Sequence, residues 1–107
     1  MRNITSESVS AFMDEKPFKK SNMEVEVRPD VTILKLFGNS IAYMYKDSPK
    51  DILITNCGWF TKVTKERLNA LPNVKVYQKG YNWYLNGHQW NGEITSVNYY
   101  NFIGHLL

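Results

Sequence analysis

At 107 residues the chain can bury one modest hydrophobic core, so we expect a single domain over residues 1–107. Hydrophobic residues make up 43% of the sequence and charged residues 21%, the composition of an ordinary soluble globular protein. The net charge of +3 permits an acidic partner such as nucleic acid but does not require one.

Several classes of protein are excluded by what the sequence lacks. The single cysteine, Cys57, rules out an intrachain disulfide and a metal site built from several thiolates of one chain. No apolar run reaches the ~18 residues of a membrane span, and the opening MRNITSESVS lacks the apolar centre of a secretory signal. We therefore expect a cytoplasmic protein with no membrane partner.

The N-terminal residues predict a short helix over Ile4 to Met13. Thr5 can cap this helix, and apolar residues at i, i+3 and i+4 from Val9 lie on one of its faces. Pro17 stops it, and the segment KPFKKSN is predicted to be a basic linker.

From Asn22 onward apolar and polar side chains alternate, which indicates β-strands with one solvated face. Turn sequences such as Arg28-Pro29-Asp30 and Phe37-Gly38-Asn39-Ser40 separate the runs. Four strands in meander order are therefore predicted, at about 22–28, 31–37, 40–46 and 52–56.

After the fourth strand the apolar period becomes helical. A helix is predicted over about 62–71, with Thr61 or Thr64 as its cap and with Leu68 and Leu71 in its buried stripe. Trp59 is expected to pack where the fourth strand meets this helix.

The remaining sequence predicts strands at about 74–79, 82–85, 88–90 and 94–100. Asn86-Gly87 is a strong hairpin signal, and Trp90 is expected to cover that hairpin. The alternation places four side chains of this region in the core: Val74, Val76, Trp83 and Leu85.

These elements together predict an α+β fold. Nearly every connection is too short for a parallel crossover, so we expect one antiparallel β-sheet carrying the N-terminal helix and the 62–71 helix. The aromatic edge strand expected at 94–100 would also allow a homodimer by strand pairing.

No enzyme motif is recognisable in the sequence. The two histidines, His88 and His105, lack metal-ligand spacing, and the glycines stand apart in turns, so no metal and no cofactor are expected. Cys57 could be a nucleophile if His88 lay within hydrogen-bond reach, but the alternative is a small apolar residue that fills the end of a strand. We expect a protein that is not an enzyme.

The candidate site lies on the strand predicted near 74–79, where burial of the valines turns Lys75, Tyr77 and Lys79 toward solvent. Tyr84 faces the same way if the next strand pairs with this one. Rings exposed beside cations bind single-stranded nucleic acid, and each stacked base contributes ~1–3 kcal/mol. The alternative is a tyrosine pair that stabilises the sheet by ~0.2–1 kcal/mol, with lysines that keep an edge soluble.

The 62–71 helix could extend this surface. Lys62 and Lys65 share the face away from the buried leucines, with Glu66 four residues after Lys62. They would join the candidate site if the helix lay beside the strand of Lys75, and they would otherwise form a solvated helix face. With about four phosphate contacts, log K against log salt would have a slope of about −3.

Four segments resemble a known family: PFKKSNMEVEV, LKLFGNSIA, NCGWFTKVTKERLNALP and YQKGYNWYLNGHQWNG. Over roughly residues 4 to 93 the chain resembles small uncharacterised accessory proteins of tailed bacteriophages, and TKERLNALP with WYLNG is the most specific part. The tail from Ile94 onward does not match the pattern of that family. The resemblance implies a phage protein acting in the host bacterial cytoplasm, and it provides no catalytic residues to carry over.

The sequence thus leads to two hypotheses of non-enzymatic binding. In the first, the protein binds single-stranded nucleic acid through Lys75, Tyr77, Lys79 and Tyr84, supported by Lys62 and Lys65. In the second, it inhibits a host protein, such as a bacterial defence system of the CRISPR or restriction type, as an anti-CRISPR protein would, through shape and exposed aromatic anchors.

Overall fold

The computed structural model describes residues 3–48 and 51–97. In this part of the chain the fold has two helices and nine strands. In order they are α1 (Ile4–Met13), β1 (Phe18–Lys20), β2 (Met23–Val27), β3 (Val31–Leu36), β4 (Asn39–Tyr45), β5 (Ile52–Ile54), α2 (Lys62–Asn69), β6 (Val76–Lys79), β7 (Asn82–Leu85), β8 (His88–Gln89) and β9 (Thr95–Ser96).

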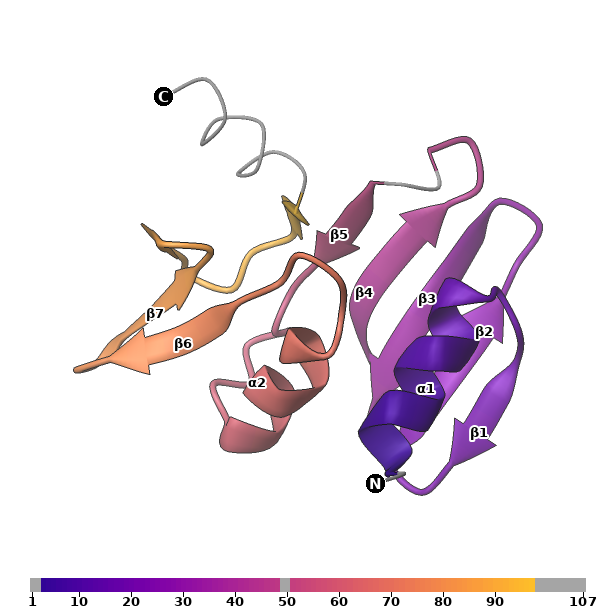
Figure 1. The fold of residues 1–107 in the computed structure, drawn as a ribbon, viewed down its shortest axis with the longest axis horizontal. Helices are drawn as coiled ribbons and strands as arrows, with labels where there is room; N and C mark the ends of the chain where they lie inside the picture. Colours follow the sequence, from indigo (N-terminus) through magenta and orange to yellow (C-terminus); the bar gives the residue numbers. More distant parts are fainter. Residues whose placement is uncertain (1–2, 49–50, 98–107) are drawn as a thin grey trace.

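The strands form two antiparallel sheets, with α2 lying between them (Figure 1). The larger sheet has the order β1-β2-β3-β4-β5-β9 and the smaller sheet the order β6-β7-β8. The predicted α+β class, the antiparallel pairing and the meander from β2 to β5 are confirmed. The strands divide between two sheets instead of one because α2 follows β5 and the chain later returns β9 to the edge of β5.

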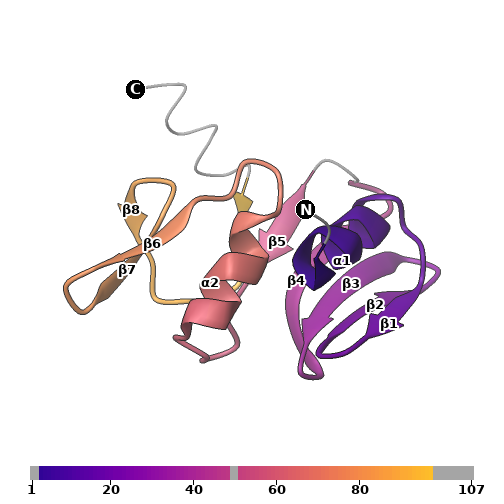
Figure 2. The same cartoon turned by 60° about the horizontal axis from the view of Figure 1, so that its bottom comes forward.

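Helix α1 has the predicted boundaries but a different cap. The Asn3 side chain accepts a hydrogen bond from the Ser6 backbone N–H at 2.9 Å, so Asn3 caps the helix and the prediction of Thr5 is wrong. Thr5 lies in the first turn and is buried, as are Val9 and Phe12. This buried side packs α1 across one face of the larger sheet (Figure 2).

Strand β1 occupies the segment that was predicted to be a basic linker. Its register with β2 places Lys19 opposite Glu24 and Lys20 opposite Met23. The Lys20 ammonium also lies 3.2 Å from a Glu7 carboxylate oxygen of α1. A strand of three residues with two consecutive lysines has no visible alternation, so its period cannot reveal it.

Helix α2 begins after Thr61, whose side chain accepts a hydrogen bond from the Thr64 N–H at 3.2 Å. Of the two predicted caps, Thr61 is therefore the one used. Leu68 and Leu71 are buried at 0% and 3% exposure, as predicted.

One buried cluster includes residues of both sheets and both helices. Leu34 of β3, Leu68 of α2 and Leu85 of β7 all have 0% exposure. Trp90 is 4% exposed, in agreement with its predicted cover over the hairpin. The smaller sheet therefore packs on the same core as the larger one, with α2 between them.

Strand β9 is an outer strand of the larger sheet and pairs with β5. It contains two residues of the strand predicted at 94–100, and positions 98–100 lie outside the described residues. Dimerisation through this edge stays a prediction.

Candidate binding surfaces

Strand pairing in the smaller sheet places four of the predicted site residues on one face. Tyr77 of β6 is opposite Tyr84 of β7, and Lys79 is opposite Asn82. Because successive side chains of a strand point to opposite faces, Lys75, Tyr77 and Lys79 all point away from the buried valines of the same segment. We call Lys75, Tyr77, Lys79 and Tyr84 the basic tyrosine face.

Lys75 precedes β6, and the following hairpin turn fixes its position. The Asn86 side-chain oxygen accepts a hydrogen bond from the Lys75 N–H at 2.8 Å, and the Asn86 N–H donates to the Lys75 carbonyl at 2.8 Å. Asn86 and Gly87 have positive φ values of 50° and 91°, as the predicted Asn-Gly hairpin turn requires.

The two tyrosine rings stack on each other across the strands. Their centroids are 5.3 Å apart and their planes differ by 10°. Tyr84 is half-buried, with Gln89 of β8 opposite it on the other side, whereas Tyr77 is 36% exposed. Since β6 is an outer strand, no further strand of the sheet covers the far side of the Tyr77 ring.

The basic tyrosine face carries positive charge without compensation. Residues 67–92 contain no aspartate or glutamate. Among the described residues, no ion pair is found for Lys75 or Lys79. Rings and uncompensated cations therefore lie together on this face, and the run without carboxylates was visible in the sequence.

The other two predicted site residues lie elsewhere. The Lys65 ammonium donates to the Gln78 side-chain oxygen at 3.2 Å and lies 5.4 Å from the centroid of the Trp83 ring. Gln78 and Trp83 are opposite each other and alternate with the tyrosines, so Lys65 is on the inner side of the sheet. Lys62 is exposed in the first turn of α2. The structure thus brings Lys75, Tyr77, Lys79 and Tyr84 together, but not Lys62 and Lys65.

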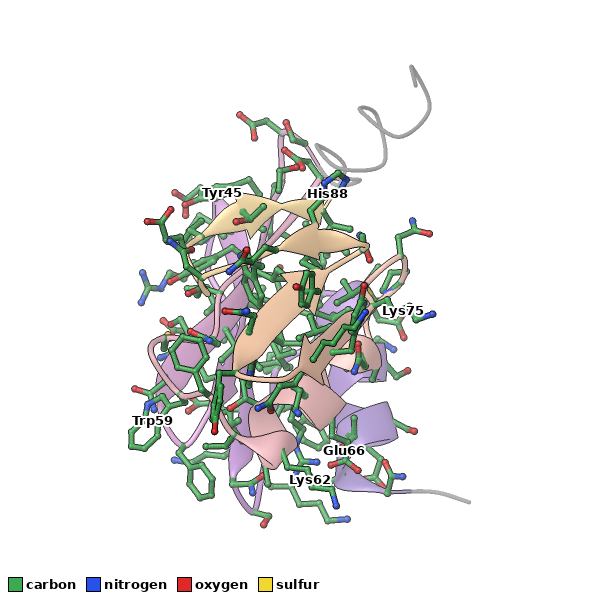
Figure 3. The ribbon with its side chains drawn as sticks, turned by 90° about the vertical axis from the view of Figure 1, so that its left-hand side faces the viewer. Tyr45, Trp59, Lys62, Glu66, Lys75 and His88 are labelled. Carbon is green, nitrogen blue, oxygen red and sulfur yellow. The ribbon has the colours of Figure 1, made fainter. Side chains whose placement is uncertain are left out.

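Trp59 is 55% exposed, so the prediction that it packs at the start of the helix is wrong. Cys57 and Gly58 before it both have positive φ, at 53° and 80°. The Trp59 N–H donates to the Asn56 carbonyl at 2.8 Å and closes a tight turn. This turn leaves the indole ring at the surface, where Figure 3 shows it projecting from the edge of the molecule.

Trp59 lines an apolar pocket of about 270 Å³ between the β3–β4 turn and the start of α2. Leu36 and Ile41 are its buried apolar lining residues, at 5% and 1% exposure. Phe37, Trp59 and Val63 are its exposed apolar lining residues, at 69%, 55% and 39%. Asn39, Thr61 and Thr64 complete the lining, and we call this pocket the apolar notch.

The geometry of Cys57 does not resemble that of an activated nucleophile. Its thiol donates to the Ser40 carbonyl at 2.8 Å, and partial desolvation of the sulfur raises the pKa of the thiol although the residue as a whole is exposed. A raised pKa keeps the sulfur protonated, whereas nucleophilic catalysis needs the thiolate. The expected role as a filler at the end of a strand is also wrong, because Cys57 is exposed in a turn.

The described residues contain no group of three or more His, Cys, Asp or Glu side chains that could hold a metal ion. His88 lies on β8 of the smaller sheet. The absence of enzymatic activity stays a prediction.

Several exposed rings were not selected from the sequence. Tyr81 is 101% exposed at the tip of the β6–β7 hairpin, next to Gly80 with its φ of 65°. Phe37 has a φ of 53° in a two-residue hairpin turn, where asparagine, aspartate or glycine is usual. An aromatic residue inside a turn motif was the signal that could have identified both positions.

Comparison with known proteins identifies a family. Residues 1–105 match the family described as Kyanoviridae Gp96 protein. The match extends through residues 94–105, so the expectation that the tail departs from the family pattern is wrong. No curated protein and no solved structure matches the chain. Within the described residues, neither helix has the length and apolar character needed to cross a membrane.

Proposed function

The chain belongs to the Kyanoviridae Gp96 family of phage proteins, and we propose that it is a non-enzymatic binding protein of the host cytoplasm that engages single-stranded nucleic acid. The basic tyrosine face makes the contact. The observation that carries the proposal is the Tyr77 ring, stacked on Tyr84 on one side, uncovered by any strand on the other, and flanked by Lys75 and Lys79.

A strand of nucleic acid would lie along β6. A base stacked on the uncovered side of Tyr77 would contribute ~1–3 kcal/mol, while Lys75 and Lys79 neutralise the phosphates on either side. Tyr81 continues the alternation of cation and ring at the hairpin tip. Because rings stack on any base and lysines contact only phosphate, the binding would have little sequence preference.

The geometry changes the expected dependence on salt. Lys62 and Lys65 are not on this face, so two lysines remain to contact phosphates. With a contribution of about 0.7 per contact for single strands, the slope of log K against log salt becomes about −1.4 instead of about −3.

Fluorescence anisotropy with a labelled 15-nucleotide oligo-dT, measured over a series of salt concentrations, tests the proposal. Lys79→Glu and Tyr77→Leu should each weaken binding about tenfold or more, because each removes a phosphate or a stacking contact. Lys16→Glu is the matched control, since it changes the net charge equally at an exposed position away from the smaller sheet. No binding at low salt, or equal loss in the control, would refute the proposal.

A second candidate function is inhibition of a host protein, of the anti-CRISPR or anti-restriction type. The apolar notch favours it, because exposed tryptophan is a frequent anchor in protein interfaces. A host complex that survives nuclease treatment, tolerates Lys75→Glu and is lost with Trp59→Ala would support this function over nucleic-acid binding.

A further inference from the structure

The apolar notch presents large rings that the fold does not use. Phe37 is 69% exposed and has a φ of 53°, a conformation that is unfavourable for a bulky side chain. Trp59 is 55% exposed, and its ring takes no part in the aromatic pairs found among the described residues. Neither residue gains its full hydrophobic stabilisation within the chain, and contiguous exposed apolar surface of this kind marks interaction sites.

The size and lining of the notch indicate an apolar side chain as its occupant. Its volume of about 270 Å³ is just below the range of about 300–1,000 Å³ for small-molecule sites. The hydroxyls of Thr61 and Thr64 in its lining already hydrogen-bond to each other at 2.9 Å. Among the lining residues, Asn39 is then the remaining polar side chain that could orient a polar metabolite, whereas a leucine or phenylalanine side chain needs none.

The charge beside the notch is positive. Lys62 lies between two lining residues, Thr61 and Val63, and no ion pair is found for it among the described residues. The first turn of α2 contains no acidic residue, so no carboxylate there offsets the positive end of the helix dipole. The nearest acidic residue along α2, Glu66, pairs with Arg67.

On the neighbouring strands, charges of opposite sign lie close to each other. Lys35 forms an ion pair with Glu26, and Lys19 lies directly opposite Glu24. Lys62 adjoins the notch along the chain, is exposed and has no ion pair among the described residues, so a complementary occupant carries negative charge there.

We propose that the apolar notch binds a short acidic segment of a partner protein, with one bulky apolar side chain between Phe37 and Trp59 and a carboxylate next to Lys62. This inference deepens the second candidate function and does not depend on nucleic-acid binding. In Figure 3, Trp59 and Lys75 project on opposite sides of the molecule, so the two surfaces can be tested separately.

Three fluorescein-labelled peptides of 12 residues are the probes. The first combines glutamates with two leucines and a central phenylalanine, the second replaces the glutamates by lysines, and the third replaces the apolar residues by alanines. Anisotropy should show binding of the first peptide only. NMR chemical-shift changes should then cluster at the Trp59 indole and the Val63 methyl groups.

Variants locate the contact. Trp59→Ala should weaken binding of the acidic peptide tenfold or more. Lys62→Glu should also weaken binding of the acidic peptide, and it should allow the lysine peptide to bind. Tyr45→Ala is the matched control, because Tyr45 is also a ring 41% exposed and lies on the larger sheet, well separated from Trp59 in Figure 3. All three variants change exposed residues, so the fold should persist, as thermal unfolding will verify.

Several outcomes would overturn the inference. They are no binding of the acidic peptide at millimolar concentration, equal binding of the lysine peptide, and unchanged affinity in Trp59→Ala. Dimerisation of the free protein that Trp59→Ala abolishes would assign the notch to a second copy of the chain instead. Oligo-dT binding should be the same in Trp59→Ala and the unmodified protein, so failure at the notch and failure at the basic tyrosine face remain distinguishable.

Discussion

In and around the larger sheet and α1, several charged side chains form ion pairs with one another, whereas the smaller sheet carries lysine and no carboxylate. Four ion pairs lie within residues 3–48, namely Lys20–Glu7, Arg28–Glu26, Lys35–Glu26 and Lys46–Glu15. In the stretch 67–92 there is no acidic residue at all. Pairing neutralises the larger sheet locally, so the positive field of the protein is concentrated on the smaller one.

Exposed apolar side chains follow the same division. Residues 3–48 contribute Met13, Phe37 and Tyr45. Residues 51–97 contribute Trp59, Phe60, Val63, Tyr77, Tyr81 and Ile94. Under the proposals above, the first region would serve mainly as a scaffold and the second would present the surfaces for partners, although both share one core.

Among the tests of this comparison, a substitution in the shared core should have the largest effect. Leu68 is 0% exposed in α2, between the two sheets, so Leu68→Ala should lower the free energy of unfolding by about 2–5 kcal/mol. All three tryptophans lie in residues 59–90, so their fluorescence reports the second region, while far-UV circular dichroism reports both. We expect the two signals to follow one urea transition, before and after the substitution.

Val63→Ala is the control for that experiment, because Val63 is on the same helix but 39% exposed. It should change the free energy of unfolding by less than about 0.5 kcal/mol. If fluorescence and circular dichroism gave separate transitions, the two regions would unfold independently. That result would contradict a single core shared by both regions.

A smaller effect is expected where the chain leaves the smaller sheet for β9. A Cβ atom at Gly92 would lie 2.2 Å from the Asn56 side-chain oxygen, and Asn56 is buried at 1% exposure. Gly92→Ala should therefore lower the free energy of unfolding by about 1–3 kcal/mol through overpacking. Gly38 is the control, because it also has a positive φ of 80° but a Cβ atom there would meet no atom within 4 Å. Gly38→Ala therefore measures the cost of the backbone conformation alone. Equal losses in a urea titration would contradict the close contact.

The elements were largely predictable because their patterns are local. The boundaries of α1 and the strand meander follow from periods of 3.6 and 2 that each segment shows by itself. The division into two sheets depends on β9 pairing with the edge strand β5. This pairing joins segments that are far apart in the sequence, so no local pattern predicts it. Strand β1 depends likewise on its pairing with β2, which its three residues do not reveal.

The candidate sites show the same limit. Alternation correctly placed Tyr77 and Tyr84 on one face, because period 2 and strand pairing determine it. The side of the sheet that α2 covers was not available from periodicity, so the sequence left open whether Lys65 joins the basic tyrosine face, and the structure places it on the inner side. The apolar notch forms from Phe37 and Trp59, residues 22 positions apart by their numbering, and no local pattern brings them together.

Lys65 offers a third test, with a smaller expected effect. Its ammonium contacts the Trp83 ring and Gln78 on the inner side of the sheet, and a cation–π contact at an exposed site contributes about 0.5–1 kcal/mol. Lys65→Ala should lower the free energy of unfolding by that amount and leave oligo-dT affinity nearly unchanged. In the same urea and anisotropy measurements, Lys79→Ala should weaken oligo-dT binding and leave the free energy of unfolding nearly unchanged. A Lys65→Ala variant that lost affinity as strongly as Lys79→Ala would return Lys65 to the binding surface.

The smallest effect concerns Glu26, which pairs with two cations of the scaffold. Hydrogen bonds from Arg28 and then Lys35 lower the pKa of Glu26 from 4.5 to about 2. Because the folded-state pKa is depressed, the ionised carboxylate stabilises the fold above about pH 4.5, and this contribution disappears as the pH falls toward 2. An NMR titration of the Glu26 carboxyl carbon should show the low pKa, and Arg28→Leu should raise it more than Lys35→Leu, since the Arg28 hydrogen bond is the larger cause. A pKa near 4.5 in the unmodified protein would mean that the scaffold charges are not paired in solution, and the contrast with the uncompensated smaller sheet would disappear.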